Sequence, residues 1–262
     1  MDKPADWKNY DDFATGIDTN RLPTTDTLAG KELSVTLSTG QVLVYQFENQ
    51  ETMTWKDGDA SGTDWYEALV VAPDVYFLDT LCTSRPRDAR TLIVNTDTRR
   101  VLSILSHVRT EEEKVEGEPL VTQQFETGVI GDPAETPGGP LPAPTRDLIG
   151  LRTFNRYSPN HLYEHVYLSS QRYCWQCLVG EQRGHGDVDL ATTYKFDEQL
   201  YLFTFREFII PVASVFFYNF NDMRSTGKFL GVTGDGRIEN NKAGAFIQKA
   251  SMTFYDKEWE PV

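Results

Sequence analysis

The chain carries the same landmark residues twice, at nearly constant spacing. Leu28–Gly30 begins a segment that reaches Trp55, and Leu148–Gly150 begins another that reaches Trp175, so the offset between them is 120 residues. The offset then becomes 125 and relates four further pairs: Tyr76 with Tyr201, Leu92 with Phe217, Asp97 with Asp222, and Arg99 with Arg224. A constant offset over about 75 residues is typical of a tandem duplication of one folding unit.

Each repeat consists of short runs rich in β-branched and aromatic residues, separated by turn residues, which predicts β-strands. In the first repeat the expected strands are Leu33–Leu37, Gln41–Phe47, Thr52–Trp55, Trp65–Val71, Val75–Asp79, Thr91–Asn95 and Val101–Leu105. In the second they are Leu151–Tyr157, Leu162–Ser169, Arg172–Val179, Val188–Phe196, Gln199–Glu207, Val212–Phe220, Thr226–Val232 and Gly244–Phe254. A meander of this length most readily closes into a barrel, because closure removes exposed strand edges. The sequence therefore predicts an all-β fold of two tandem up-and-down antiparallel β-barrels.

Composition predicts the boundaries of these units. Residues 1–27 are polar and form an N-terminal lead-in, the first barrel covers 28–108, and the second covers 148–262. Residues 109–147 include a stretch of 14 residues with five prolines and three glycines. Such a stretch cannot form a central strand or a helix, which favours a linker or a lid over a barrel mouth.

The overall charge and the cysteine content limit the classes of partner. The formal net charge of −14 argues against a nucleic-acid binder or a protein that docks on anionic membranes. No apolar run is long enough to span a membrane, and the N-terminus lacks the apolar core of a signal peptide. Three cysteines do not make a disulfide framework. We therefore expect a soluble cytoplasmic protein; whether it forms a homodimer stays open.

The familiar catalytic and metal-binding motifs are missing from the sequence. Cys174 and Cys177 have C-x-x-C spacing, but on a predicted strand they face opposite sides and cannot easily share a metal or a disulfide. His161 and His165 share one face of a strand but are too far apart for one metal ion. There is no nucleophile elbow, P-loop or dinucleotide-binding motif. We therefore predict no metal and no cofactor.

The two repeats differ most at a few polar positions. Four residues of the second repeat replace mainly apolar counterparts of the first: Tyr157 replaces Leu37, Tyr163 replaces Leu43, His165 replaces Tyr45, and Glu207 replaces Cys82. Strand alternation puts Glu207 on the same face as Tyr201, Phe203 and Phe205. Buried polar groups are costly unless they are satisfied, so this gain predicts a working cavity in the second barrel. The alternative is an outward-facing, solvated strand edge.

Several short motifs resemble a known family. The motifs are a Tyr163-Glu164-x-x-Tyr167 strand, the aromatic run Tyr201–Glu207 and an Arg-Ser-x-Gly turn that starts at Arg224. Together with the repeated Leu-x-Gly, they resemble the molybdenum-cofactor-biosynthesis protein F (MoaF) family over both repeats. The resemblance implies two lipocalin-like, calycin-type barrels per chain. It implies little about chemistry, because the role of that family is poorly defined.

A more distant resemblance is to phenolic acid decarboxylases, which are single lipocalin-like barrels. In this sequence Gly150 and Tyr157 match the opening glycine and tyrosine of that family, and Glu207 matches its glutamate at the end of a strand. The resemblance implies that tyrosines hold the substrate carboxylate while the glutamate and an arginine transfer protons. The sequence departs at Asn155, where that family has its other tyrosine, and Arg183 is only a loop candidate for the arginine.

These residues support the hypothesis of an enzyme that binds a small, largely apolar oxygenated molecule. Glu207 would be the general acid or base, and Tyr157 and Tyr163 would donate hydrogen bonds to a developing oxyanion. The expected substrate-binding residues are Trp175, Phe203, Phe205, Tyr201, His165 and Arg183. Lyase, isomerase or cyclase chemistry would fit, including a (hetero-)Diels–Alder cyclisation in natural-product biosynthesis. The alternatives are a non-catalytic carrier or accessory protein, and a duplicated barrel with a filled core.

Overall fold

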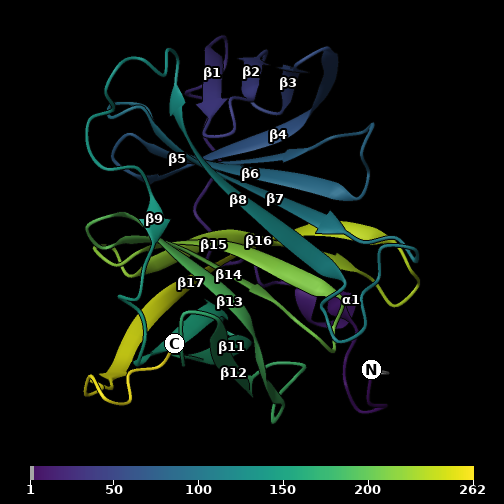
Figure 1. Cartoon of the computed structure of the whole chain (residues 1–262). Coiled ribbons are helices and arrows are strands. Elements are labelled where there is room, and N and C mark those ends of the chain that lie inside the picture. Colours follow the sequence, from purple (N-terminus) through teal and green to yellow (C-terminus); the bar gives the residue numbers. More distant parts are fainter. Residues whose placement is uncertain (1–2) are drawn as a thin grey trace. The chain divides into compact units, whose positions relative to one another are not determined.

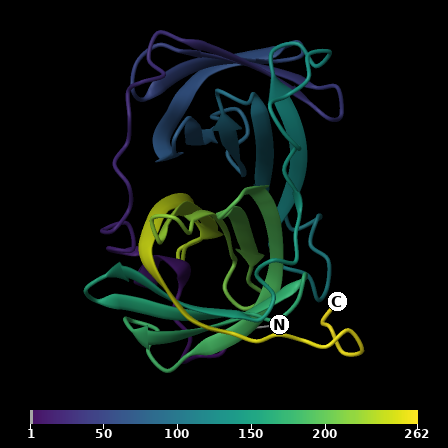
Figure 2. The ribbon, with the colours of Figure 1, turned by 90° about the vertical axis from the view of Figure 1, so that its left-hand side faces the viewer.

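The computed structural model describes residues 3–262, and these residues form almost nothing but β-strands (Figure 1). They include one helix, α1 (Tyr10–Ala14), followed along the chain by two closed, eight-stranded antiparallel barrels. The two rings of strands can be followed by their colours in Figure 2. The predicted all-β fold of tandem lipocalin-like barrels is confirmed.

The first barrel is an uninterrupted meander in which every strand pairs with the next one along the chain. Its strands are β1 (Glu32–Leu37), β2 (Val42–Phe47), β3 (Thr52–Asp57), β4 (Ala60–Ala72), β5 (Val75–Leu81), β6 (Asp88–Asn95), β7 (Arg100–Val108) and β8 (Val121–Ile130). The barrel closes where β1 pairs with β8, through Val35 with Ile130 and Leu37 with Gly128. Alternate residues of β1 to β3 are buried, which explains the alternating sequence pattern of these strands.

Strand β8 lies inside the segment 109–147, where the sequence predicted a linker or lid and no strand. The residues of β8 are mostly only partly buried, so the strand lacks the alternating apolar signal of its neighbours. It forms because β1 would otherwise present a row of unpaired backbone groups at an open edge. The proline-rich part of the segment follows β8, and its one short strand is β9 (Ala143–Pro144).

The second barrel has the same topology. Its strands are β10 (Leu151–Ser158), β11 (His161–Tyr167), β12 (Arg172–Val179), β13 (Gly186–Asp197), β14 (Leu200–Arg206), β15 (Val212–Asn219), β16 (Arg224–Val232) and β17 (Ile238–Met252). Strand β10 pairs with β17, which closes the ring, and β9 lies at the outer edge of β13. The buried core of this barrel is dominated by aromatic rings, whereas the core of the first barrel is largely aliphatic.

The offset between the repeats relates corresponding strands of the two barrels, and its change from 120 to 125 locates an insertion in the second one. Strands β5 and β14 have the same length and are related by the offset of 125 residues. The offset changes from 120 because residues 58–59 connect β3 to β4, whereas the longer loop 180–185 connects β12 to β13. The loop 180–185 is therefore specific to the second barrel.

Most of the predicted lead-in packs with the second barrel. Residues 3–21 form one compact unit with residues 108–122 and 144–262. The hydroxyl of Tyr10 donates a hydrogen bond to the carbonyl of Phe229 over 2.8 Å. Further along, the amide of Gly244 donates to the carbonyl of Ile17 over 3.1 Å. Across residues 3–262, no helix is long and apolar enough to cross a membrane.

Candidate functional site

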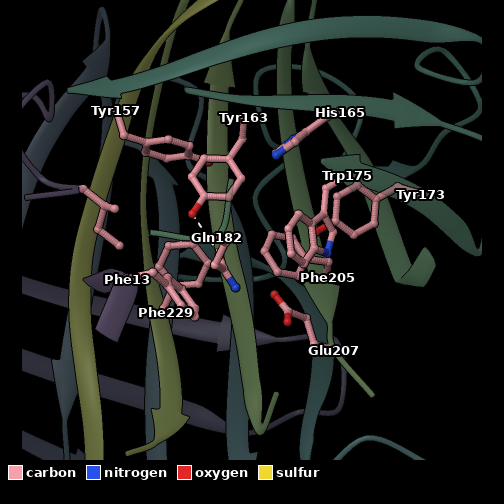
Figure 3. Close-up of a pocket in the computed structure, with 11 residues that line it drawn as sticks. Phe13, Tyr157, Tyr163, His165, Tyr173, Trp175, Gln182, Phe205, Glu207 and Phe229 are labelled. Atoms are coloured by element: carbon pink, nitrogen blue, oxygen red, sulfur yellow. Dashed lines mark hydrogen bonds between the residues drawn. The ribbon is translucent and has the colours of Figure 1, made fainter. Parts of the chain in front are cut away.

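A cavity lies inside the second barrel, enclosed mainly by aromatic side chains (Figure 3). Its free volume is about 30 Å³, comparable with the volume of one water molecule in the liquid. A drug-sized ligand needs roughly ten times that space or more. A larger ligand therefore requires some lining side chains to move.

Strand alternation explains which residues line the cavity. Tyr163 and His165 are two residues apart on β11, and Tyr173 and Trp175 are two apart on β12. Residues at this spacing point to the same face of a sheet, which here is the interior of the barrel. Tyr157 of β10 lines the cavity beside them.

Strand β14 supplies the other side of the cavity by the same rule. Phe205 is the last inward-facing residue of β14, and Glu207 follows directly after the strand. The amide of Glu207 still donates to the carbonyl of Val212 over 3.0 Å, which keeps the backbone in the β14–β15 hairpin. Glu207 is therefore held by backbone pairing rather than by its side chain.

The aromatic rings form a continuous wall. The ring centroids of Tyr157 and Tyr163 lie 5.8 Å apart, and those of Tyr163 and Trp175 lie 6.0 Å apart. On the other side, the centroids of Tyr173 and Phe205 are 4.9 Å apart. Edge-to-face and tilted contacts at these distances are favourable, so this part of the wall is closely packed.

Two polar groups in the wall lack any partner among residues 3–262. They are Oε2 of Glu207 and Nδ1 of His165, both of which are buried. Figure 3 shows the carboxyl and the imidazole pointing into the space between the rings. A buried polar atom without a partner costs about 1–3 kcal/mol. In a barrel whose core serves only for packing, two such unpartnered atoms would lower the stability without any benefit.

Burial fixes the protonation states of these groups. Burial, and then the nearby carboxylates of Asp189 and Asp187, raise the pKa of Glu207 well above its usual value. Burial lowers the pKa of His165 to about 3. Burial also raises the pKa of the Tyr157 hydroxyl. Burial therefore favours the uncharged form of all three groups: a protonated carboxyl, a neutral imidazole and a protonated phenol.

A second carboxyl lies behind the wall. The indole N–H of Trp175 donates to Oδ2 of Asp189 over 2.9 Å, and the amide of Phe208 donates to Oδ1 over 3.2 Å. Asp189 is completely buried. Its two bonds tie β12, β13 and the residue after Glu207 together.

A loop and the N-terminal segment complete the lining of the cavity. Gln182, from the loop 180–185, accepts a hydrogen bond from the hydroxyl of Tyr163 over 2.8 Å. Phe13 and Ile17, from α1 and the residues after it, fill the remaining opening. All three side chains lie outside the strands, so a change in their positions would leave the backbone pairing of the barrel intact.

The structure brings together six of the nine predicted site residues. The residues that line the cavity are Glu207, Tyr157, Tyr163, Trp175, Phe205 and His165. The other three lie elsewhere. Phe203 is fully buried in the ring cluster and stacks on Tyr218, Tyr201 donates a hydrogen bond to Asp147, and Arg183 is exposed on its loop.

Sequence reasoning missed five lining residues. Tyr173 could have been predicted, because it lies two residues before Trp175 on the same strand. Gln182 could have been found from the change in repeat offset, which marks an insertion at the site. Phe13, Ile17 and Phe229 carried no such signal, because their approach to the cavity depends on the path of the chain in three dimensions.

The other titratable side chains form no metal site in the described part of the chain. No group of three or more histidine, cysteine, aspartate or glutamate side chains is arranged to hold a metal ion among residues 3–262. Cys82, Cys174 and Cys177 are free thiols.

Two glycines make room for the N-terminal segment, which gives a testable prediction. A Cβ at Gly244 would lie 2.5 Å from Cα of Arg21, and one at Gly231 would lie 2.9 Å from the Tyr10 ring. We expect Gly244→Ala to displace residues 16–21, at a cost of about 1–3 kcal/mol. Hydrogen exchange of the Gly244 amide, which now donates to Ile17, should accelerate.

Ala250→Val is the matched control, because it adds bulk at an exposed residue of the same strand. It should leave the protection of the Gly244 amide unchanged. Equal protection in Gly244→Ala and the wild type would show that the N-terminal segment is not seated against β17.

Fold and site together define a protein with tandem lipocalin-like barrels and an enclosed aromatic cavity in the second barrel. Two sequence-family models match: the MoaF N-terminal domain over residues 5–110 and the MoaF C-terminal domain over residues 142–253. Protein MoaF of Klebsiella aerogenes is 30% identical over 241 residues, which cover 89% of this chain and 90% of that protein. The chain belongs to the MoaF family, as the short motifs indicated.

Among solved structures, a chain from Burkholderia vietnamiensis, provisionally described as a beta-lactamase, is 12% identical to this protein. The match has a TM-score of 0.35 and covers 39% of this chain and 95% of the other. A match at this level does not extend to function.

Proposed function

We propose that the protein is an enzyme that transforms a small, largely apolar oxygenated molecule inside the second barrel by acid–base chemistry, without a metal or an organic cofactor. The observation that carries the proposal is the pair of unpartnered polar atoms, Oε2 of Glu207 and Nδ1 of His165, in an otherwise aromatic cavity. Each would be satisfied by a substrate oxygen. Uncharged polar groups around an apolar centre favour an uncharged ligand.

Glu207 is the general acid in this proposal. A carboxyl with a raised pKa still holds its proton at neutral pH and can give it to a carbonyl, ether or leaving hydroxyl oxygen. The hydroxyl of Tyr157 donates a hydrogen bond to the oxygen on which charge develops. His165 offers Nδ1 to a second oxygen of the substrate, as donor or acceptor according to its tautomer.

Such a site fits lyase, isomerase or cyclase reactions that need one proton donor and a fixed substrate shape. The closely packed wall of Tyr163, Trp175 and Phe205 would hold a flexible molecule in a near-attack conformation. A (hetero-)Diels–Alder cyclisation belongs to this class, because it needs a shaped apolar cavity and one hydrogen bond to the reacting carbonyl. Three free thiols favour a reducing compartment, and we place the reaction in the cytoplasm.

The test is native mass spectrometry of the protein isolated from its own host, with identification of any small molecule that leaves with it. Ile17→Trp should abolish co-purification, because a larger ring at the mouth fills the cavity of the second barrel. Leu43→Trp is the matched control, since Leu43 corresponds to Tyr163 and lines the pocket of the first barrel.

A molecule lost from Ile17→Trp and kept by Leu43→Trp would support the proposal, and its structure would define the reaction to assay. A molecule lost only from Leu43→Trp would move the site to the first barrel. A molecule that binds but is never converted by the wild-type protein would indicate a carrier, which is the alternative function of the same cavity.

A further inference from the structure

The carboxyl behind the cavity wall belongs to an arrangement that occurs in both barrels. In the first barrel the indole of Trp55 donates to Oδ2 of Asp64 over 2.6 Å, and the amide of Thr83 donates to Oδ1 over 3.0 Å. In the second barrel Trp175 and Phe208 make the same two bonds to Asp189. Both copies therefore clamp one buried aspartate between an indole and the loop amide after the fifth strand.

The residue just before that loop amide differs between the copies. It is Cys82 in the first barrel and Glu207 in the second. In the first barrel burial raises the pKa of Asp64, but hydrogen bonds from Thr83 and Trp55 outweigh it and hold this pKa below its usual value. In the second barrel, burial and then Asp187 raise the pKa of Asp189 to about 7, despite its two donors.

Asp189 accepts the amide of Phe208, the residue after Glu207, and its charge raises the pKa of Glu207, so the two buried carboxyls are neighbours. Two such carboxyls cannot both be ionised easily, which favours one shared proton. Hydrogen bonding decides where this proton resides. Both oxygens of Asp189 accept an N–H, which favours its ionised form, whereas Oε2 of Glu207 receives no donor from the described residues. A proton on Asp189 would have to compete with the N–H groups that already face its oxygens.

We propose that Asp189 is a positioning residue of the site, whose clamped carboxylate keeps the shared proton on Glu207 and directs it into the cavity. The proposal rests on the proposed role of Glu207 as general acid. The same clamp is present in the first barrel, where Cys82 occupies the position of Glu207.

Other groups near the pair do not take over this role. The titratable side chains that line the cavity with Glu207 or act on its charge are Tyr157 of β10, Tyr163 and His165 of β11, Tyr173 of β12, and Asp187 and Asp189 of β13. Arg172 of β12 acts on Asp189, where its charge favours the ionised form. Burial holds the tyrosines protonated and the histidine neutral at pH 7, so they carry no charge. Asp187 is only half-buried and is therefore better screened by solvent than Asp189.

The experiment follows the side-chain carboxyl carbon of Glu207 by NMR in the ligand-free protein labelled with ¹³C-glutamate. Glu207→Gln identifies the resonance by its loss. In the wild type, Glu207 should stay protonated through pH 7. In Asp189→Asn its titration midpoint should fall by roughly 1–3 pH units, because the like charge is gone.

Asp64→Asn is the matched control: it breaks the same clamp in the first barrel and should leave the midpoint of Glu207 unchanged. Trp175→Phe is a second variant that tests the proposal if Asp189→Asn does not fold. Loss of the indole donor should move the proton towards Asp189, so Glu207 should again lose its own proton at lower pH. An unchanged midpoint in both variants would overturn the proposal.

The titration separates this inference from the proposed enzyme function. A shifted midpoint in a protein that never converts its ligand would support the proton pair and contradict catalysis. A Glu207→Gln variant that loses turnover, together with an Asp189→Asn variant whose pH–rate profile does not move, would contradict only the role of Asp189.

Discussion

Replacing Glu207 with glutamine is expected to lower the turnover of the molecule that co-purifies with the protein by about 10²–10⁴-fold. Glutamine has nearly the same shape and can still donate a hydrogen bond, but it cannot release a proton. The affinity for the molecule should change less than threefold, since the aromatic wall and His165 stay in place. The measurement is a comparison of turnover by mass spectrometry with the dissociation constant by calorimetry.

Glu164→Gln is the control for this prediction. Glu164 is also almost completely buried, but its carboxylate bonds to Arg152 and Gln176 and does not line the cavity. Its replacement should leave turnover intact. Wild-type turnover in Glu207→Gln would remove Glu207 from the chemistry, and loss of turnover in both variants would indicate damage to the fold instead.

The second large effect concerns stability in acid. The pKa of His165 is lowered by burial from 6.5 to about 3, so the unfolded chain takes up a proton at this residue that the folded barrel excludes. The contribution of neutral, buried His165 to the free energy of unfolding is fully present above pH 6.5. It is lost as the pH falls towards 3. At pH 4 the loss amounts to about 3 kcal/mol. We expect His165→Phe to remove this loss, which makes the variant relatively more resistant to acid.

The measurement is the hydrogen-exchange free energy of the slowest amides of β11 and β12 at pH 7 and at pH 4. His185→Phe is the control, because His185 lies half-buried on the loop 180–185 and should show the wild-type decline. An equally steep decline in His165→Phe and the wild type would mean that the imidazole is hydrated and not enclosed.

Much of the fold could be predicted because apolar and polar residues alternate along most of the strands. Both repeats contain runs such as Leu33–Leu37, in which every second residue is buried. Strand β8 could not be predicted, because its partly buried residues carry no apolar pattern and its place depends on the unpaired edge of β1. The position of α1 depends on contacts far along the chain, from Tyr10 to Phe229, which local sequence does not encode.

The candidate site could be predicted where it depends on strand alternation and on differences between the repeats. Glu207, Phe205 and His165 were found in this way, and the structure places them around one cavity. Tyr201 shares a face with Glu207 but does not line this cavity, because that face extends to the other end of the strand, where the hydroxyl of Tyr201 bonds to Asp147. Arg183 does not line it either, and a loop residue has no periodicity from which its orientation could be predicted.

Comparison of the two barrels shows where the second one diverged. Both retain an indole–aspartate clamp, through Trp55 and Asp64 in one and Trp175 and Asp189 in the other. Only the second has a carboxyl beside the clamp and an additional loop at the mouth. The unpartnered Oε2 of Glu207 and Nδ1 of His165 also occur in the second barrel, and each such buried atom lowers the stability of the fold.

The most direct measurement is a crystal structure of Glu207→Gln isolated from the host together with the molecule that this variant retains. The molecule should lie between Tyr157, Trp175 and Phe205, with one oxygen at the amide of residue 207 and Phe13 and Ile17 displaced from the mouth. A molecule bound in the first barrel, or one bound in the second barrel with no polar contact to residue 207 or His165, would contradict the assignment of the site.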